Sequence, residues 1–156
     1  MDTLVFDTQE GMQAAQFAVL QTAVRSLDWF DTDLSETRAH EQAYADAIRT
    51  MLTASRIAHA RLLLISDTHF WRHCTQLNGL LRIYGHVFEV RLLDEGDRNG
   101  AERFLLSDTA VARRFHADAY RGEASEDGQA RALCRQRFES MWARAHLPRE
   151  GRQLSI

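Results

Sequence analysis

The sequence predicts an α/β domain in which a mostly parallel sheet is covered by helices. Short apolar runs alternate with segments whose apolar residues recur at helical spacing, as in β-α-β units. One run, Ala60–Ser66, is almost continuously apolar, which is typical of a central strand covered on both faces. With 156 residues, 45% of them hydrophobic, the chain has enough material for one core, so a single domain over 1–156 is expected.

The first part of the chain alternates strand and helix. Thr8 is expected to cap the first helix, and Ser35 to cap the second. The expected elements are a strand at Thr3–Phe6, a helix from Met12 to about Arg25, a strand at Leu27–Phe30, a helix from Ser35 to about Ser55, a strand at Ala60–Ser66, a helix over Phe70–Tyr84, and a strand at Val87–Leu93.

The second part of the chain is richer in strands. It begins with a polar loop that carries two glycines and four charges. The expected elements are this loop at Asp94–Gly100, strands at Arg103–Ser107, Ala110–His116 and Ala117–Arg121, a helix opened by Asp127 and continuing through Trp142, and a last strand at Leu154–Ile156.

Composition limits the classes of function. The net charge of −3 and the pI of about 6.1 differ from the basic excess of dedicated nucleic-acid binders, so nucleic acid is not expected as a partner. All 19 basic residues are arginine, which excludes lysine-based Schiff bases and phosphate loops. No glycine-rich nucleotide loop, nucleophile elbow or Cys-x-x-Cys motif occurs, and no cofactor is expected.

The cysteines and the distribution of apolar residues predict the cellular compartment. Cys74 and Cys134 lie far apart on predicted amphipathic helices, as buried hydrophobes of a reducing compartment do. The first ten residues are acidic and lack the apolar region of a signal peptide, and no window approaches 18 apolar residues. A cytoplasmic protein without membrane association is therefore expected.

Two segments resemble a known family. The segment from Ala101 to Asp108 (AERFLLSD) precedes Phe138-Glu-Ser-Met-Trp142 by about 30 residues. Together with the element order, they resemble the phospholipase D-like family, in which a late strand carries H-x-K-x-x-x-x-D and a later helix carries F-x-x-x-W. Carried over by position, Ala101 stands where the family has its nucleophilic histidine, Arg103 where it has a phosphate-binding lysine, and Asp108 matches the aspartate.

The resemblance implies an α-β-α layered domain that has lost the family reaction, because alanine cannot form a phosphohistidine. The chain also resembles uncharacterised proteobacterial domains that are inactive relatives of this fold. A binding or interaction module is therefore expected, taking a small anionic ligand or a protein partner. Since family members work as two facing halves, the resemblance further implies a homodimer. Two alternatives stay open, a phosphodiesterase built on His116, Asp108 and Arg103, and nucleic-acid binding through an arginine strip.

Polar residues follow several predicted strands and could meet on one rim of the sheet. Such carboxylates and histidines could act as acid and base, although the same residues commonly make turns and helix caps. The candidates are Asp31, Asp33, Asp67, His69, Asp108 and His116. His69 and His73 are spaced as zinc ligands on a helix, but without further ligands at recognisable spacing no metal site is expected.

A second set of residues could bind an anion. Trp71 and Arg72 begin a predicted helix, where an aromatic ring and a guanidinium could hold a phosphate. Four arginines lie in the strand-rich part of the chain, namely Arg103, Arg113, Arg114 and Arg121. Among them, Arg113 and Arg121 could form a basic rim together with Phe115. The alternative interpretation is ordinary, with Trp71 in the core and the arginines on a solvated strand face, paired with acidic neighbours.

Overall fold

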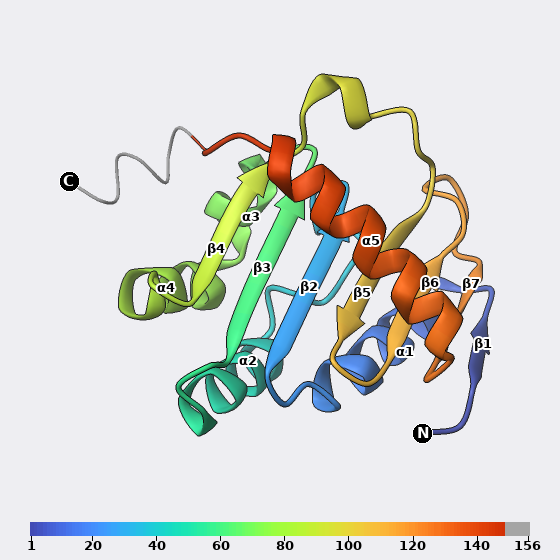
Figure 1. Cartoon of the computed structure of the whole chain (residues 1–156), viewed down its shortest axis with the longest axis horizontal. Coiled ribbons are helices and arrows are strands. Elements are labelled where there is room, and N and C mark those ends of the chain that lie inside the picture. Colours follow the sequence, from blue (N-terminus) through green and yellow to red (C-terminus); the bar gives the residue numbers. More distant parts are fainter. Residues whose placement is uncertain (149–156) are drawn as a thin grey trace.

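The computed structural model describes residues 1–148, in which one seven-stranded sheet forms the middle layer (Figure 1). Its order is β1-β7-β6-β5-β2-β3-β4. The strands are β1 (Leu4–Phe6), β2 (Ser26–Asp31), β3 (His59–Leu64), β4 (Phe88–Leu92), β5 (Arg103–Ser107), β6 (Val111–Arg114) and β7 (Gly122–Ser125).

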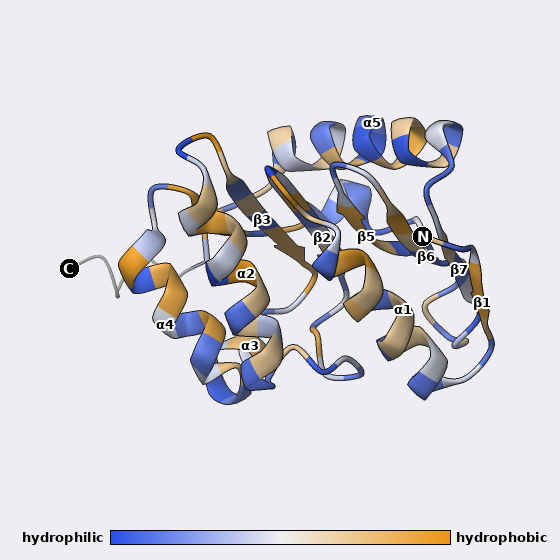
Figure 2. Cartoon of the chain, turned by 90° about the horizontal axis from the view of Figure 1, so that it is seen from below, coloured by the Kyte–Doolittle hydropathy of each residue, from blue (hydrophilic) through white to orange (hydrophobic). Residues whose placement is uncertain are grey.

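Helices cover both faces of the sheet. They are α1 (Gln9–Gln21), α2 (Gln42–Ala54), α3 (Thr68–His73), α4 (Thr75–Tyr84) and α5 (Gly128–Arg144), with a short 3-10 helix, η1 (Glu95–Asp97). Figure 2 shows α1 to α4 on one side of the sheet and α5 lying across the other. None of the helices within residues 1–148 is long and apolar enough to cross a membrane.

The strand directions change halfway through the chain. β2, β3 and β4 run parallel, because helices connect them and return the chain to the same end of the sheet. From β5 onward every neighbouring pair is antiparallel, including β5 beside β2. The expected mostly parallel sheet was therefore wrong. After β4 the chain crosses by the η1 segment and continues in hairpins, which need no helix.

Two hydrophobic cores follow from the alternation of side chains along the strands. On β2, Trp29 points to the core under α1 to α4, and Phe30 points to the core under α5. The α5 core is the smaller one and is rich in aromatic rings, since Phe104, Phe138 and Trp142 pack together there. Because both faces of the central strands are covered, they are apolar on both sides, as predicted for Ala60–Ser66.

Several predicted boundaries move because side chains bind nearby backbone groups. Thr8 does cap α1, accepting from the nitrogen of Gly11, and Asp127 caps α5. Ser35 does not cap α2. Both the nitrogen and the hydroxyl of Ser35 donate to Asp33, so this segment forms turns and α2 starts only at Gln42.

Two further expectations were wrong for similar reasons. The predicted helix over Phe70–Tyr84 breaks at Cys74, where the side chain of Asn78 donates to the carbonyl groups of Phe70 and Trp71. The expected strand at 117–121 is a turn, and the strand follows it as β7. The predicted strand at Leu154–Ile156 lies outside the described residues.

Gly122 has a structural role at the start of β7. A Cβ atom there would lie 1.8 Å from the carbonyl oxygen of Arg113 and 2.7 Å from the ring of Phe6. The close pairing of β6 with β7, and the packing of Phe6 over it, therefore require glycine at this position.

Candidate anion-binding site

Three strands bring charged residues to one edge of the sheet. β2 ends at this edge, antiparallel β5 begins there, and β6 ends there. Asp31 lies one residue beyond the pair formed by Phe30 and Phe104, so it comes beside Arg103 at the start of β5. We call this group the rim and define it as Asp31, Thr32, Glu36, Arg103, Arg114 and Tyr120.

Arg103 is almost fully buried, with 7% of its surface exposed. Its Nε donates to the hydroxyl of Thr32 at 2.9 Å, and its Nη1 donates to the carbonyl oxygens of Gly100 and Glu102. Its guanidinium lies 5.0 Å from the ring centroid of Phe30. Burial lowers the pKa of Arg103, and the charge of Arg114 acts in the same direction, whereas the charges of Asp31 and Asp118 oppose this shift.

Arg114 is equally buried, with 6% exposed. It donates to the carbonyl oxygens of Ala117 and Ala119, which holds the turn between β6 and β7. Its guanidinium lies 4.8 Å from the ring centroid of Tyr120. In the part of the chain that the structure describes, its acidic partner is Glu36, at 3.4 Å.

The nearest carboxyl group compensates these charges poorly. Asp31 is buried, and its Oδ2 accepts from the backbone nitrogen of Leu34 at 2.7 Å. Burial raises the pKa of the Asp31 carboxyl above its ordinary value, although the hydrogen bond from Leu34 and the charges of Arg114 and Arg103 act in the opposite direction. The protein therefore favours the neutral form of Asp31 more than water does.

The two arginines repel each other, and Glu36 and Asp31 offset this repulsion only in part. Arg103 and Arg114 are direct partners in the register of β5 and β6, so their side chains leave the same face of the sheet. Like charges directly opposite one another destabilise a strand pair. A bound phosphate group would compensate both charges, and planar guanidinium groups suit its oxygen atoms well.

The residues that resemble the phospholipase D-like motif lie at the two ends of β5. Ala101 lies at the rim, where its carbonyl oxygen accepts from the nitrogen of Ala117 at 2.8 Å. Asp108 follows the last residue of β5, and its Oδ1 accepts from the backbone nitrogen of Val24. Because β5 runs antiparallel to β2, Asp108 is at the opposite edge from Asp31, and the two do not share a rim as the parallel sheet implied.

Neighbouring arginines of the expected basic strip point to opposite faces. The side chain of Arg113 points to the α5 side of the sheet, where its Nε donates to Glu102 at 3.0 Å. Arg137 of α5 pairs with the same carboxylate. The side chain of Arg114 points to the side covered by α1 to α4 and reaches the rim. The strip is thus divided by strand alternation, and only part of it reaches the rim.

The residues after β3 lie at the same edge, because β2 and β3 are parallel and both end there. Trp71 donates from Nε1 to Asp67 at 2.8 Å and packs against the core, whereas Arg72 is exposed. The rings of His69 and His73 have centroids 4.8 Å apart. Burial, followed by the charge of His73, lowers the pKa of His69, while Asp33 raises it. Within residues 1–148, no cluster of three potential metal ligands is found.

His116 is exposed on the turn that follows β6. Its Nδ1 accepts from the backbone nitrogen of Asp118 at 3.1 Å, and the Asp118 carboxylate is 3.6 Å away. Since the nitrogen of the next residue, Ala117, donates to the carbonyl oxygen of Ala101, the imidazole lies at the same edge as Ala101. The expected combination of His116 with Asp108 is not assembled, because Asp108 is at the other end of β5.

Three rim residues have no signal in the sequence. Thr32, Glu36 and Tyr120 come from turns, and each acquires its role only through a partner distant in the sequence. Tyr120 was close to the predicted arginine strip, but its position over Arg114 depends on the length of the turn between β6 and β7.

Comparisons with known proteins agree with this fold. A family model described as a domain of unknown function (DUF7931) matches residues 8–154, whereas no curated protein matches the chain in sequence. NucT from Helicobacter pylori has 15% sequence identity and a TM-score of 0.64, with 94% of this chain and 99% of NucT covered. This similarity confirms the predicted α/β layering, apart from the mostly parallel sheet.

A second solved structure is that of TrmBL2, an archaeal chromatin protein described as showing a novel mode of DNA binding. It has 14% identity and a TM-score of 0.70. The match covers 95% of this chain and 54% of TrmBL2, so the chain spans about half the length of that protein. These neighbours contradict the expectation that nucleic acid is no partner. The net charge of −3 averages over the molecule and does not describe the local charge at the rim.

Proposed function

We propose that this chain, which belongs to the family of domains of unknown function DUF7931, is a binding module that holds the phosphate backbone of a nucleic acid at the rim. The observation that carries the proposal is the pair of buried, directly opposed arginines, Arg103 and Arg114, beside a carboxyl group whose pKa is raised. The DNA binding described for TrmBL2 supports the choice of ligand.

The chemistry of the rim suits binding better than the family reaction. Alanine at position 101 provides no nucleophile, so the double displacement of the phospholipase D-like family has no first step here. Arg103 uses Nε and Nη1 for bonds to described residues of the protein, which leaves Nη2 to donate to a phosphate oxygen. Phosphate contacts of this kind position a nucleic acid without reading its sequence.

The proposal is tested by binding a fluorescent 20-nucleotide DNA, followed by anisotropy at increasing salt. Arg103→Gln and Arg114→Gln should each weaken binding about tenfold and lower the slope against salt by about one. Arg49→Gln is the matched control, because Arg49 is an exposed arginine of α2 that pairs with Asp46. Unchanged DNA binding by both rim variants would contradict the proposal.

The rim arginines also hold turns, so loss of folding has to be separated from loss of binding. Inorganic phosphate should raise the Tm of the wild type and of Arg49→Gln, because a ligand that binds only the folded state stabilises it. The same phosphate should not raise the Tm of Arg103→Gln or Arg114→Gln. A rim variant that melts cooperatively but gains nothing from phosphate has lost the binding site and not the fold.

A second candidate function, a phosphodiesterase, rests on His116. Its imidazole belongs to the rim edge. Because Nδ1 accepts from the backbone nitrogen of Asp118, the neutral ring keeps its proton on Nε2, and Nδ1 could take a proton from an attacking water only after releasing this bond. The test is hydrolysis of bis(p-nitrophenyl) phosphate by the wild type and by His116→Ala. His86→Ala, at an exposed histidine after α4, is the control. Equal rates for all three proteins would remove this candidate.

A further inference from the structure

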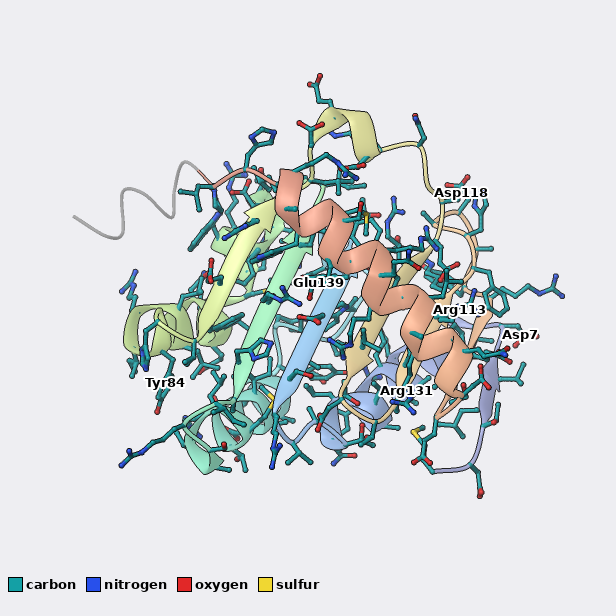
Figure 3. The ribbon with its side chains drawn as sticks, in the orientation of Figure 1. Asp7, Tyr84, Arg113, Asp118, Arg131 and Glu139 are labelled. Atoms are coloured by element: carbon teal, nitrogen blue, oxygen red, sulfur yellow. The ribbon has the colours of Figure 1, made fainter. Side chains whose placement is uncertain are left out.

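A hollow of about 520 Å³ lies beside the hairpin that contributes Arg114 and Tyr120 to the rim. It is lined by Val5, Phe6, Asp7, Phe115, Arg121, Gly122 and Glu123. The lining comes from β1, from β7 and from the turn between β6 and β7, at the edge of the sheet where Asp7 is labelled in Figure 3. Its volume falls within the range of small-ligand sites.

Strand alternation connects this hollow with the rim. Arg114 and Tyr120 contact each other at the rim, and the next residue of each, Phe115 and Arg121, lines the hollow. The nitrogen of Phe115 donates to the carbonyl oxygen of Arg121 at 2.9 Å, which keeps the two segments paired. The two sites are therefore neighbours along one short ribbon, separated by a single residue along the chain.

The hollow carries an exposed aromatic ring, which burial in the core does not explain. Phe115 is 43% exposed, and Val5 beside the hollow is 80% exposed. The guanidinium of Arg113 lies 5.5 Å from the ring centroid of Phe115. An exposed ring beside arginines is the usual platform on which single-stranded nucleic acids stack a base, because every base has an aromatic face.

The charges that line the hollow distinguish a base from a phosphate. Arg121 is exposed and can donate to a base or to its phosphate. Asp7 and Glu123 line the same hollow, and their carboxylates repel phosphate but accept hydrogen bonds from the exocyclic amino groups of bases. The lining thus suits a base with an amino group better than it suits a second phosphate.

We infer that the hollow is a subsite for one unstacked nucleobase, with Phe115 as its stacking platform, next to the phosphate site at the rim. The inference rests on the proposed function and adds the class of ligand, a single strand or an unpaired nucleotide. A base inside a duplex is already stacked and paired and must be displaced before it can enter. Adenine, cytosine and guanine carry amino groups and are preferred over thymine.

The experiment compares 12-nucleotide oligomers of dC, dA and dT with a duplex of mixed sequence, by fluorescence anisotropy. The wild type should bind oligo-dC and oligo-dA more tightly than oligo-dT and the duplex. Phe115→Leu should weaken oligo-dC binding about tenfold, whereas Phe115→Tyr should retain it, because tyrosine keeps the aromatic face. Ile83→Ala, at an exposed apolar residue of α4 on the far side of the sheet, should change nothing.

A 2-aminopurine base placed within oligo-dA reports stacking directly. Its fluorescence should fall on binding to the wild type and remain high with Phe115→Leu. If Arg103→Gln and Arg114→Gln weaken binding but Phe115→Leu binds every oligomer as the wild type does, the subsite is wrong and the proposed function stands. If no oligomer binds the wild type, the proposed function fails and the subsite fails with it.

Discussion

The rim and the region under α5 both contain arginines beside carboxyl groups, but the opposite charges are matched more closely under α5. Under α5, Asp28 is fully buried and accepts hydrogen bonds from Arg61 at 2.8 Å and from Arg135 at 3.3 Å. Glu139, which projects from α5 over the sheet (Figure 3), completes the group by pairing with Arg61. We call these four residues the α5 ion cluster.

The α5 ion cluster has two positive and two negative groups, and its contacts reinforce one another. The Arg61 guanidinium lies 4.9 Å from the ring centroid of Phe138 and 5.4 Å from that of Trp142, so it is held by aromatic faces as well as by carboxylates. At the rim the two arginines face Glu36 and an Asp31 that is biased toward its neutral form. A charge that is paired internally stabilises the fold, whereas one left without compensation is available to a ligand.

The largest effect should follow from removing the central carboxylate of the α5 ion cluster. Asp28→Asn leaves the half-buried Arg61 with Glu139 as its remaining carboxylate partner, and breaking a buried ion pair of this kind costs up to about 3–5 kcal/mol. The free energy of unfolding, measured in urea, should fall by that amount while DNA binding is unchanged. The surface pair gives the control, since Asp46→Asn should cost less than about 1 kcal/mol. Similar losses for both variants would contradict the comparison.

Replacing both Asp28 and Arg61 should cost less stability than replacing Asp28 alone. Asp28 and Arg61 are register partners on β2 and β3, so Asp28→Leu with Arg61→Met puts two apolar side chains side by side. This double variant should recover at least half of the stability lost by Asp28→Asn, because apolar replacement of a buried pair is often neutral. Urea unfolding again measures it.

Apolar replacement of the two rim arginines should mainly affect phosphate binding. Arg103→Met with Arg114→Met removes the two opposed charges together with the bonds that they make to the turns. Stability should therefore fall, and the gain in Tm from phosphate should disappear. A double rim variant that still gains stability from phosphate would show that the anion binds elsewhere.

The difference between the two regions also marks what the sequence could predict. The bounds of β5, the caps at Thr8 and Asp127, and the burial of β3 depend on nearby residues, and the sequence predicted them. The partner of Asp28 did not have such a signal, because Arg61 is 33 residues away and meets it only through strand register.

The candidate site shows the same limit. Arg103 and Arg114 were predicted as anion-binding residues because arginine suits phosphate, but their direct opposition depends on an antiparallel β5. The crossover after β4 decides that β5 runs antiparallel to β2. This segment has no helical pattern in the sequence from which the direction could be predicted. The same error placed Asp108 with Asp31, although they lie at opposite ends of the sheet.

The smallest effect should come from Asp31→Asn, and it tests whether the rim lacks negative charge. Burial raises the folded-state pKa of Asp31 above 3.8, so its contribution to stability is present below that pH and is lost as the pH rises through the folded value. Asparagine can still accept from Leu34 and does not ionise. The wild type should therefore lose more Tm than Asp31→Asn between pH 4 and pH 7.

Asp31→Asn should also strengthen the binding of phosphate and DNA. Removing the fraction of negative charge that Asp31 carries at pH 7 leaves Arg103 and Arg114 with less compensation, so phosphate or DNA should bind up to about fivefold more tightly at low salt. Asp33→Asn, two residues away and half-buried, controls for a general change in net charge. If Asp31→Asn weakens binding, its carboxylate orients the arginines through their charges, and the rim is then a balanced cluster like the one under α5.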